Sequence, residues 1–203
     1  MKKLLLLAAV FLTSASAFSQ SFTHGVGVVI TVDKIRDLEA RPGYGFTYSP
    51  RFNFAETENT SVSVGIPISL VVAASASYSA YSFNDEIYLD DDMSVGINFN
   101  APVMANFNFG AGSSRENDSR LGGFVGAGFG LNWSANSDIS SLDGEGNRVE
   151  RTTGGTTFGP AANAGMRIGV GRRGKNIEIK LSYFKGLDDN ELNLFGLSCL
   201  FNF

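Results

Sequence analysis

The sequence predicts an all-β fold: an eight-stranded antiparallel up-and-down transmembrane β-barrel that follows an N-terminal signal peptide. Three observations predict it. Apolar residues alternate with small or polar residues in successive segments of about ten residues, as in membrane barrels. The last strand ends on an aromatic residue, Phe203, as expected of a barrel delivered to the outer-membrane insertion machinery. The first residues have the pattern of an export signal.

The N-terminal segment is typical of a secretory signal peptide. Lys2 and Lys3 precede an apolar run over 4–12, and an Ala-Ser-Ala site follows at 15–17. This run is much shorter than the ~20 apolar residues that a bilayer-spanning helix needs. We therefore expect a signal peptide over 1–19, cleaved after Ala17 or Ser19, and one outer-membrane β-barrel domain over 20–203.

The first four strands each place bulky apolar residues on one face and small or polar residues on the other, because side chains alternate along a strand. They are expected near 21–32 (Phe22, Val26, Val28, Ile30, Val32), 43–54 (Tyr44, Phe46, Tyr48, Phe52, Phe54), 61–70 (Val62, Val64, Ile66, Ile68, Leu70) and 95–109 (Val95, Ile97, Phe99, Val103, Phe107, Phe109).

The last four strands repeat the pattern. They are expected near 121–133 (Leu121, Val125, Phe129, Leu131, Trp133), 158–170 (Phe158, Met166, Ile168, Val170), 177–183 (Ile177, Ile179, Leu181, Tyr183) and 194–203 (Phe195, Leu197, Cys199, Phe201, Phe203). The last set contains the predicted barrel-assembly signal, Phe195, Leu197, Phe201 and Phe203. Four prolines fall inside these strands, at positions 50, 67, 102 and 160, and predict bulges or strand ends because proline lacks a ladder donor.

The polar faces decide which side of the barrel is inside. They contain mainly Gly, Ser, Thr and Asn, with only Arg51, Arg167, Glu178 and Lys180 charged. A soluble lipocalin-like barrel would instead expose a polar face rich in Lys and Glu. An eight-stranded barrel also has little interior room for the large apolar face. We therefore expect the apolar face to contact lipid and the charged residues to form a lumen polar cluster, a salt-bridged plug in preference to a transport or catalytic site.

Aromatic residues near strand ends are expected to mark the membrane interface. Tyr44, Tyr48, Trp133 and Tyr183 are assigned this role, toward the ends on the external-loop side. Cys199 is the only cysteine and is expected on the outward face of the last strand, so the chain forms no internal disulfide.

An even number of strands places both termini on one side, which is periplasmic in bacterial barrels, with the longer loops outside. The expected periplasmic turns are 55–60, 110–120 and 171–176, and the expected external loops are 33–42, 75–92, 135–155 and 187–191. The second loop is acidic and begins with a strand-like segment, which suggests a hairpin that extends beyond the membrane. A protruding sheet edge can pair with a partner strand. The candidate interaction residues are Tyr78, Tyr81, Asp85, Glu86, Asp90, Asp91 and Asp92.

The signal peptide, the eight alternating strands, the glycine-rich run over 109–130 and the terminal LFGLSCLFNF resemble the small outer-membrane β-barrel domain family. This is the OmpX/OmpA-like group of Gram-negative bacteria, which includes the PorT-type proteins. The resemblance implies the fold and an outer-membrane location. Because the family includes adhesion and envelope-integrity proteins, it implies no single activity.

The expected function is a structural, envelope or surface-interaction role, with a narrow transport or small-ligand barrel as the alternative. An enzyme is not expected, because the only histidine, His24, lies at the wrong end of the barrel for an outer-rim base. No cofactor or metal site is predicted, since the acidic loops lack EF-hand-like spacing. The expected partners are outer-membrane lipid and lipopolysaccharide, the barrel-assembly machinery and a surface protein. Nucleic acid is not expected to bind a mildly acidic chain, and a monomer is expected.

Overall fold

The computed structural model describes residues 21–34, 40–83, 86–114, 117–142, 148–170, 174–188 and 192–203, and gives only the backbone in the parts of 74–94 and 136–154 within these ranges. In this part of the chain nine strands form one antiparallel sheet: β1 (Ser21–Lys34), β2 (Arg41–Phe54), β3 (Thr60–Gly65), β4 (Ile68–Phe83), β5 (Glu86–Gly110), β6 (Leu121–Leu142), β7 (Arg148–Gly169), β8 (Asn176–Lys185) and β9 (Asn193–Asn202). No helix among these residues is long and apolar enough to cross a membrane.

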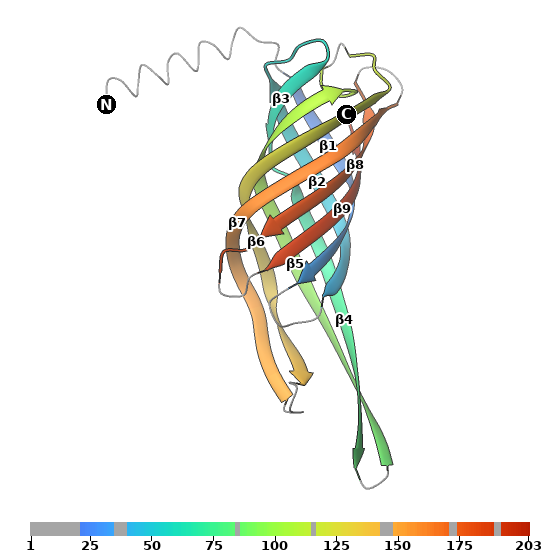
Figure 1. Cartoon of the computed structure of the whole chain (residues 1–203), viewed down its shortest axis with the longest axis vertical. Helices are drawn as coiled ribbons and strands as arrows, with labels where there is room; N and C mark the ends of the chain where they lie inside the picture. The colour runs from blue at the N-terminus through green and yellow to red at the C-terminus, as the bar shows by residue number, and fades with distance from the viewer. Residues whose placement is uncertain are drawn as a thin grey trace, which may run out of the picture.

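The sheet closes into a barrel because its first strand pairs on both sides, with β2 and with β9 (Figure 1). Closure is completed at the end of the chain. There the backbone of His24 donates to the Phe203 carbonyl (3.0 Å) and accepts from the Phe203 N–H (2.9 Å). The first residues of β1 and the last of β9 therefore lie together, at what we call the terminal end of the barrel.

Strands β3 and β4 are two halves of one barrel strand. On one side of the break Gly65 pairs with Met104, and on the other side Ser69 pairs with Asn100, so the register to β5 is the same on both sides. The break falls at Ile66 and Pro67, where proline removes a ladder donor. The barrel thus has eight strands, as predicted.

The orientation of the side chains follows the alternation. Apart from glycines and prolines, the buried residues comprise 24 polar or charged residues and 11 apolar ones, whereas large apolar side chains from all nine strands are exposed on the outside. A soluble barrel would show the opposite arrangement. The lipocalin-like alternative is therefore wrong, and the exterior is suited to hydrocarbon.

The bulges or strand ends that the sequence predicted at four prolines occur at only one of them. Pro50, Pro102 and Pro160 lie within continuous pairing to β1, β6 and β6 respectively, and only Pro67 coincides with a break. The register explains this outcome. It places Pro67 across from Pro102, and Pro50 lies on β2 beside the same break. The missing donors of these four prolines therefore lie close to one level of the wall, whereas Pro42, near the start of β2, lies within continuous pairing to β1.

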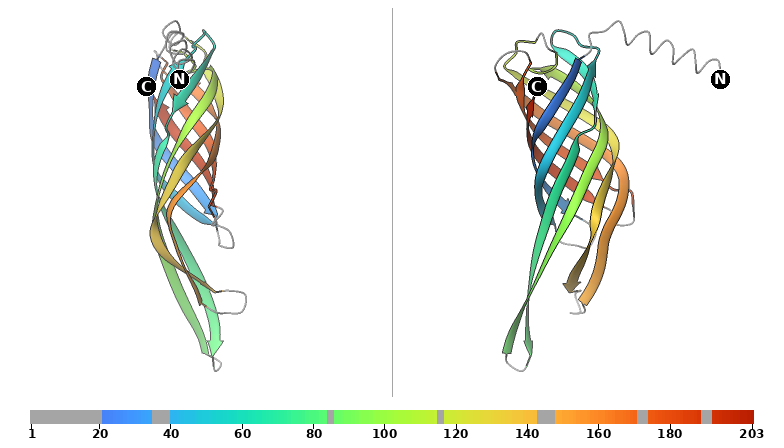
Figure 2. Two further views of the ribbon diagram at one scale, coloured as in Figure 1. Left: turned by 90° about the vertical axis from the view of Figure 1, so that its left-hand side faces the viewer. Right: turned by 180° about the vertical axis from the view of Figure 1, so that it is seen from behind.

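At the opposite end, the hairpin end, two long hairpins extend beyond the barrel wall (Figures 1 and 2). The β4–β5 ladder continues to the pair Phe83–Glu86, as predicted for a protruding hairpin. The β6–β7 ladder continues to the pair Leu142–Arg148, with one register shift between Ser134 and Ser137. The prediction of a loop over 135–155 is therefore wrong for most of that segment. Its sequence lacks apolar alternation because a strand outside lipid needs only backbone pairing.

Packing inside the barrel requires close approach between β6 and β7. Phe124 is buried in the lumen, and its neighbour across the ladder is Gly165. A Cβ at position 165 would lie 2.5 Å from the Ile179 carbonyl oxygen and 2.6 Å from two ring carbons of Phe124. Position 165 therefore needs glycine so that the Phe124 ring can occupy the lumen.

We predict that Gly165→Ala lowers the free energy of unfolding by about 1–3 kcal/mol, the usual cost of overpacking. The measurement is urea unfolding of the barrel in lipid vesicles, followed by heat-modifiable gel mobility. Ala164→Val, which enlarges the adjacent outward-facing residue, is the matched control. Equal urea midpoints for the two variants would show that the Phe124 ring does not restrict the size of the side chain at position 165.

Candidate functional site in the barrel lumen

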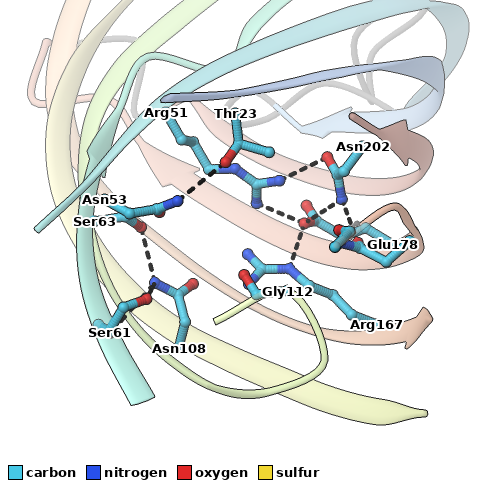
Figure 3. Close-up of polar contacts among 12 residues, drawn as sticks. Thr23, Arg51, Asn53, Ser61, Ser63, Asn108, Gly112, Arg167, Glu178 and Asn202 are labelled. Carbon is cyan, nitrogen blue, oxygen red and sulfur yellow. Dashed lines mark hydrogen bonds and ion pairs between the residues drawn. The ribbon is translucent and has the colours of Figure 1, made fainter. Parts of the chain in front are cut away.

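Three of the four predicted cluster residues meet in the lumen near the terminal end. The Glu178 carboxylate oxygen Oε2 accepts hydrogen bonds from Arg51 Nη1 (2.6 Å) and Arg167 Nε (2.9 Å) (Figure 3). Arg167 and Glu178 are direct partners on β7 and β8, whereas Arg51 reaches Glu178 across the interior from β2. All three side chains are buried. The ion pairs therefore bridge the lumen from wall to wall.

Two asparagines complete this cluster, and the sequence analysis did not assign them a role. Asn202 Nδ2 donates to Glu178 Oε2 (3.1 Å) and to Asn176 Oδ1 (2.6 Å), and Asn202 Oδ1 accepts from Arg51 Nη2 (2.6 Å). Their inward phase in β8 and β9 was the available signal. Both asparagines are fully buried. Their amide groups satisfy hydrogen bonds of the buried Arg51 and Glu178 that no water could reach.

The turn after β5 folds into the lumen and contacts the same cluster. Arg167 Nη1 donates to the Gly112 carbonyl (3.3 Å), and the Arg167 guanidinium lies 4.5 Å from the centre of the Phe124 ring. Gly112 has φ +73°, and a Cβ there would lie 2.5 Å from Asn176 Nδ2. Ala111 and Ser113 are buried, so this segment closes the terminal end, whereas the sequence indicated only a periplasmic turn.

Farther toward the hairpin end the lumen is apolar. Met104, Ala161, Phe184, Leu192 and Leu194 form a buried cluster, which we call the apolar cap. The sequence did not indicate that Phe184 lies in the lumen, because Phe184 follows Tyr183 directly and the two neighbouring rings point to opposite faces of the strand. Beyond the cap, Asn98 and Asn132 exchange two amide hydrogen bonds, of 2.7 and 3.3 Å. Arg41 and Asp33 form an ion pair of 2.6 Å near the rim.

Three of the predicted interface aromatics lie toward the hairpin end. Tyr44 is 71% exposed near the start of β2, Trp133 is exposed near the last β5–β6 pairs, and the Tyr183 hydroxyl donates to Asn193 Oδ1 (2.7 Å). The placement of Tyr48 with them is wrong. Its hydroxyl lies 2.6 Å from His24 Nδ1, and its ring stacks on His24 toward the terminal end, because it lies at the middle of β2 and reaches away from the loops.

The terminal strand has the predicted exposed face. Phe195, Leu197, Phe201 and Phe203 are all exposed on the exterior, and Cys199 lies between them as an exposed free cysteine. The Phe203 ring lies 5.8 Å from the His24 ring and 6.1 Å from the Phe201 ring. The only histidine is therefore surrounded by aromatic residues at the terminal end.

The predicted external interaction residues are only partly covered. Asp85 lies outside the described residues, and Tyr78, Tyr81, Glu86, Asp90, Asp91 and Asp92 lie where the backbone alone is described. That backbone pairs Tyr78 with Asp91 and Ser79 with Asp90. In the part of the chain that the structure covers, no group of three His, Cys, Asp or Glu residues is arranged to hold a metal.

Several solved structures of outer-membrane proteins have a similar architecture. Neisserial surface protein A (NspA) is similar over 91% of this chain and 97% of its own, with a TM-score of 0.55 and 13% identity. The chain has the fold of a small outer-membrane β-barrel. Ail of Yersinia pestis, in complex with the heparin analogue sucrose octasulfate, is similar over 91% of this chain and 98% of its own (TM-score 0.43, 16% identity). The outer-membrane enzyme PagL is similar over 87% and 97% (TM-score 0.40, 11% identity). No family model and no curated protein matches the chain.

In this small barrel, we predict that Glu178→Gln lowers the free energy of unfolding by about 3–5 kcal/mol, because it leaves Arg51 and Arg167 buried without their carboxylate. Urea unfolding in vesicles measures the loss. Glu58→Gln, which changes an exposed carboxylate in the β2–β3 turn, is the control. A Glu178→Gln barrel as stable as the control would mean that the ion pairs across the lumen do not stabilise the folded barrel.

Proposed function

We propose that the mature chain is an integral outer-membrane barrel with a structural and surface-interaction role, and that it binds its partner through the free edges of the protruding β4–β5 hairpin. The observation that carries this proposal is the strand ladder beyond the barrel wall. Strand β4 pairs with β2 only as far as Ala73, and β5 pairs with β6 only from Asn98. Beyond these residues each strand is paired only with the other in the described backbone.

Such an edge presents unpaired N–H and C=O groups outside the membrane. A partner segment in extended conformation can add to it as a further strand, with backbone hydrogen bonds providing affinity. The segment also contains Asp90, Asp91 and Asp92, and acidic residues on an edge disfavour pairing between identical copies. These features support recognition of a different chain and a monomeric barrel.

The lipid-suited exterior supports outer-membrane residence, with lipid and lipopolysaccharide around the barrel and both termini in the periplasm. An export signal over 1–19 and recognition of Phe195, Leu197, Phe201 and Phe203 by the barrel-assembly machinery belong to the same proposal. The lumen favours a structural role over transport, because the Arg51–Glu178 bridge and the apolar cap both cross it. His24 contacts aromatic residues, which supports a role without catalysis.

We predict that removal of Phe203 reduces assembly several-fold, because it removes the terminal aromatic residue and its backbone bonds to His24. The measurement is the fraction of heat-modifiable protein in the outer-membrane fraction of expressing cells. Phe158→Ala, which removes an exposed aromatic ring from β7, is the control and should assemble normally. Normal assembly without Phe203 would refute the assembly signal.

We predict that deleting residues 77–90 abolishes partner binding and leaves assembly intact. The assay is binding of the purified barrel to a library of β-strand-forming decapeptides. The combined variant Asp90→Asn, Asp91→Asn and Asp92→Asn keeps the strand edge and should still bind. A deletion barrel that binds peptides as well as the unaltered one would exclude the hairpin edge, and loss of binding in the charge variant alone would assign recognition to the carboxylates.

A further inference from the structure

The charged cluster in the lumen is not neutral. Arg51, Arg167 and Lys180 supply three cationic groups, and Glu178 is the single carboxylate among them. Both arginines pair with Glu178, through the same oxygen. Lys180 is only 4% exposed, and no hydrogen bond or ion pair joins its ammonium to any described residue. A buried charge in this position needs a compensating partner.

Lys180 lies between two cavities. The cavity nearer the terminal end, which we call the lower cavity, has a volume of about 10 Å³ and is lined by Arg51, Asn106, Asn163, Glu178 and Lys180. The cavity nearer the hairpin end, which we call the upper cavity, has a volume of about 30 Å³ and borders the apolar cap. A single water needs roughly 10–15 Å³ of such space, so the lower cavity fits at most one water and the upper cavity fits a larger occupant.

The two cavities differ in hydrogen-bonding character. In the lower cavity the buried atoms without a partner are acceptors, Asn106 Oδ1, Asn163 Oδ1 and Glu178 Oε1. In the upper cavity a buried donor, Asn100 Nδ2, has no partner, as is true of Asn163 Oδ1, and the Ser182 and Ser198 hydroxyls line the same space. Asn163 lines both cavities, and its amide can present either its oxygen or its NH₂ group. Donors around a lysine suit an anion, and acceptors do not.

The space exists because of the residues that form the wall there. Inward-facing positions in one row, across the break between β3 and β4 and then β5, β6 and β7, are Pro67, Pro102, Gly130 and Gly159, which carry rings or no side chain. Pro67 and Pro102 line the upper cavity directly. None of these residues can extend a polar group toward Lys180, and the single carboxylate of the cluster, Glu178, is shared by three cations, so the cluster keeps an excess of positive charge beside this space.

We propose that the upper cavity is a binding site for one small monovalent anion of chloride size, held by the Lys180 ammonium and the Asn100 amide NH₂ group. The anion neutralises Lys180 and satisfies the Asn100 donor in one step. It is enclosed between the Glu178 cluster and the apolar cap, so it contributes to the stability of the barrel and does not serve transport.

The test uses bromide as the probe. Crystals of the detergent-folded barrel grown in sodium bromide are expected to show one anomalous peak in the upper cavity. The same peak is expected for Lys185→Gln, which removes an exposed lysine from the same strand. Lys180→Gln removes the cation, and Asn100→Asp places a fixed carboxylate in the cavity; both should lose the peak.

Stability provides a second readout that does not depend on crystals. At constant ionic strength, raising bromide in exchange for sulfate should raise the urea midpoint of the unaltered barrel and of Lys185→Gln, since a ligand stabilises the state that binds it. Lys180→Gln and Asn100→Asp should show no such shift. An unaltered barrel without a bromide peak and with a midpoint independent of bromide would overturn the proposal, as would a peak that persists in Lys180→Gln.

Discussion

Every backbone N–H and C=O group that faces hydrocarbon must be paired within the protein, and the rest of this structure depends on that constraint. The pairing of β1 with both β2 and β9 meets it by leaving no edge in the wall. Closure then fixes which face of each strand is inside. Because the period is two, the same alternation that directs Phe46 or Leu181 outward directs Arg51 and Lys180 inward.

The inside of so narrow a barrel has to be filled by short polar side chains and by charges that pair across it. Glu178 is the centre of this filling, because one of its oxygens accepts from residues on β2, β7 and β9. A bond between neighbouring strands such as Arg167–Glu178 adds little that the ladder lacks. The Arg51–Glu178 bond is different, since it ties opposite walls and resists flattening of the barrel.

The barrel strands could be predicted from the sequence because lipid and lumen impose opposite demands on alternate residues. Outside the membrane that demand disappears, so the outer part of the β6–β7 hairpin, with Ser134, Asn136 and Ser137, carries no periodic signal. Individual contacts were likewise beyond prediction. Alternation placed Arg51, Arg167 and Glu178 inside, but the lumen position of Gly112 depends on the path of a turn, and the direction of Tyr48 depends on its rotamer.

The prolines show how a local departure from the rule is confined. Each removes one donor, and scattered prolines would break the ladder at several levels. In this barrel the register brings Pro67 opposite Pro102, and Gly130 and Gly159 follow on the next two strands. The row that weakens the ladder is also the row with the least side-chain volume facing inward. The break in the strand ladder therefore lies at the same level as the upper cavity of the lumen, which Lys180 lines. A constraint on backbone pairing and an unfilled volume beside a buried cation thus have the same origin in the sequence.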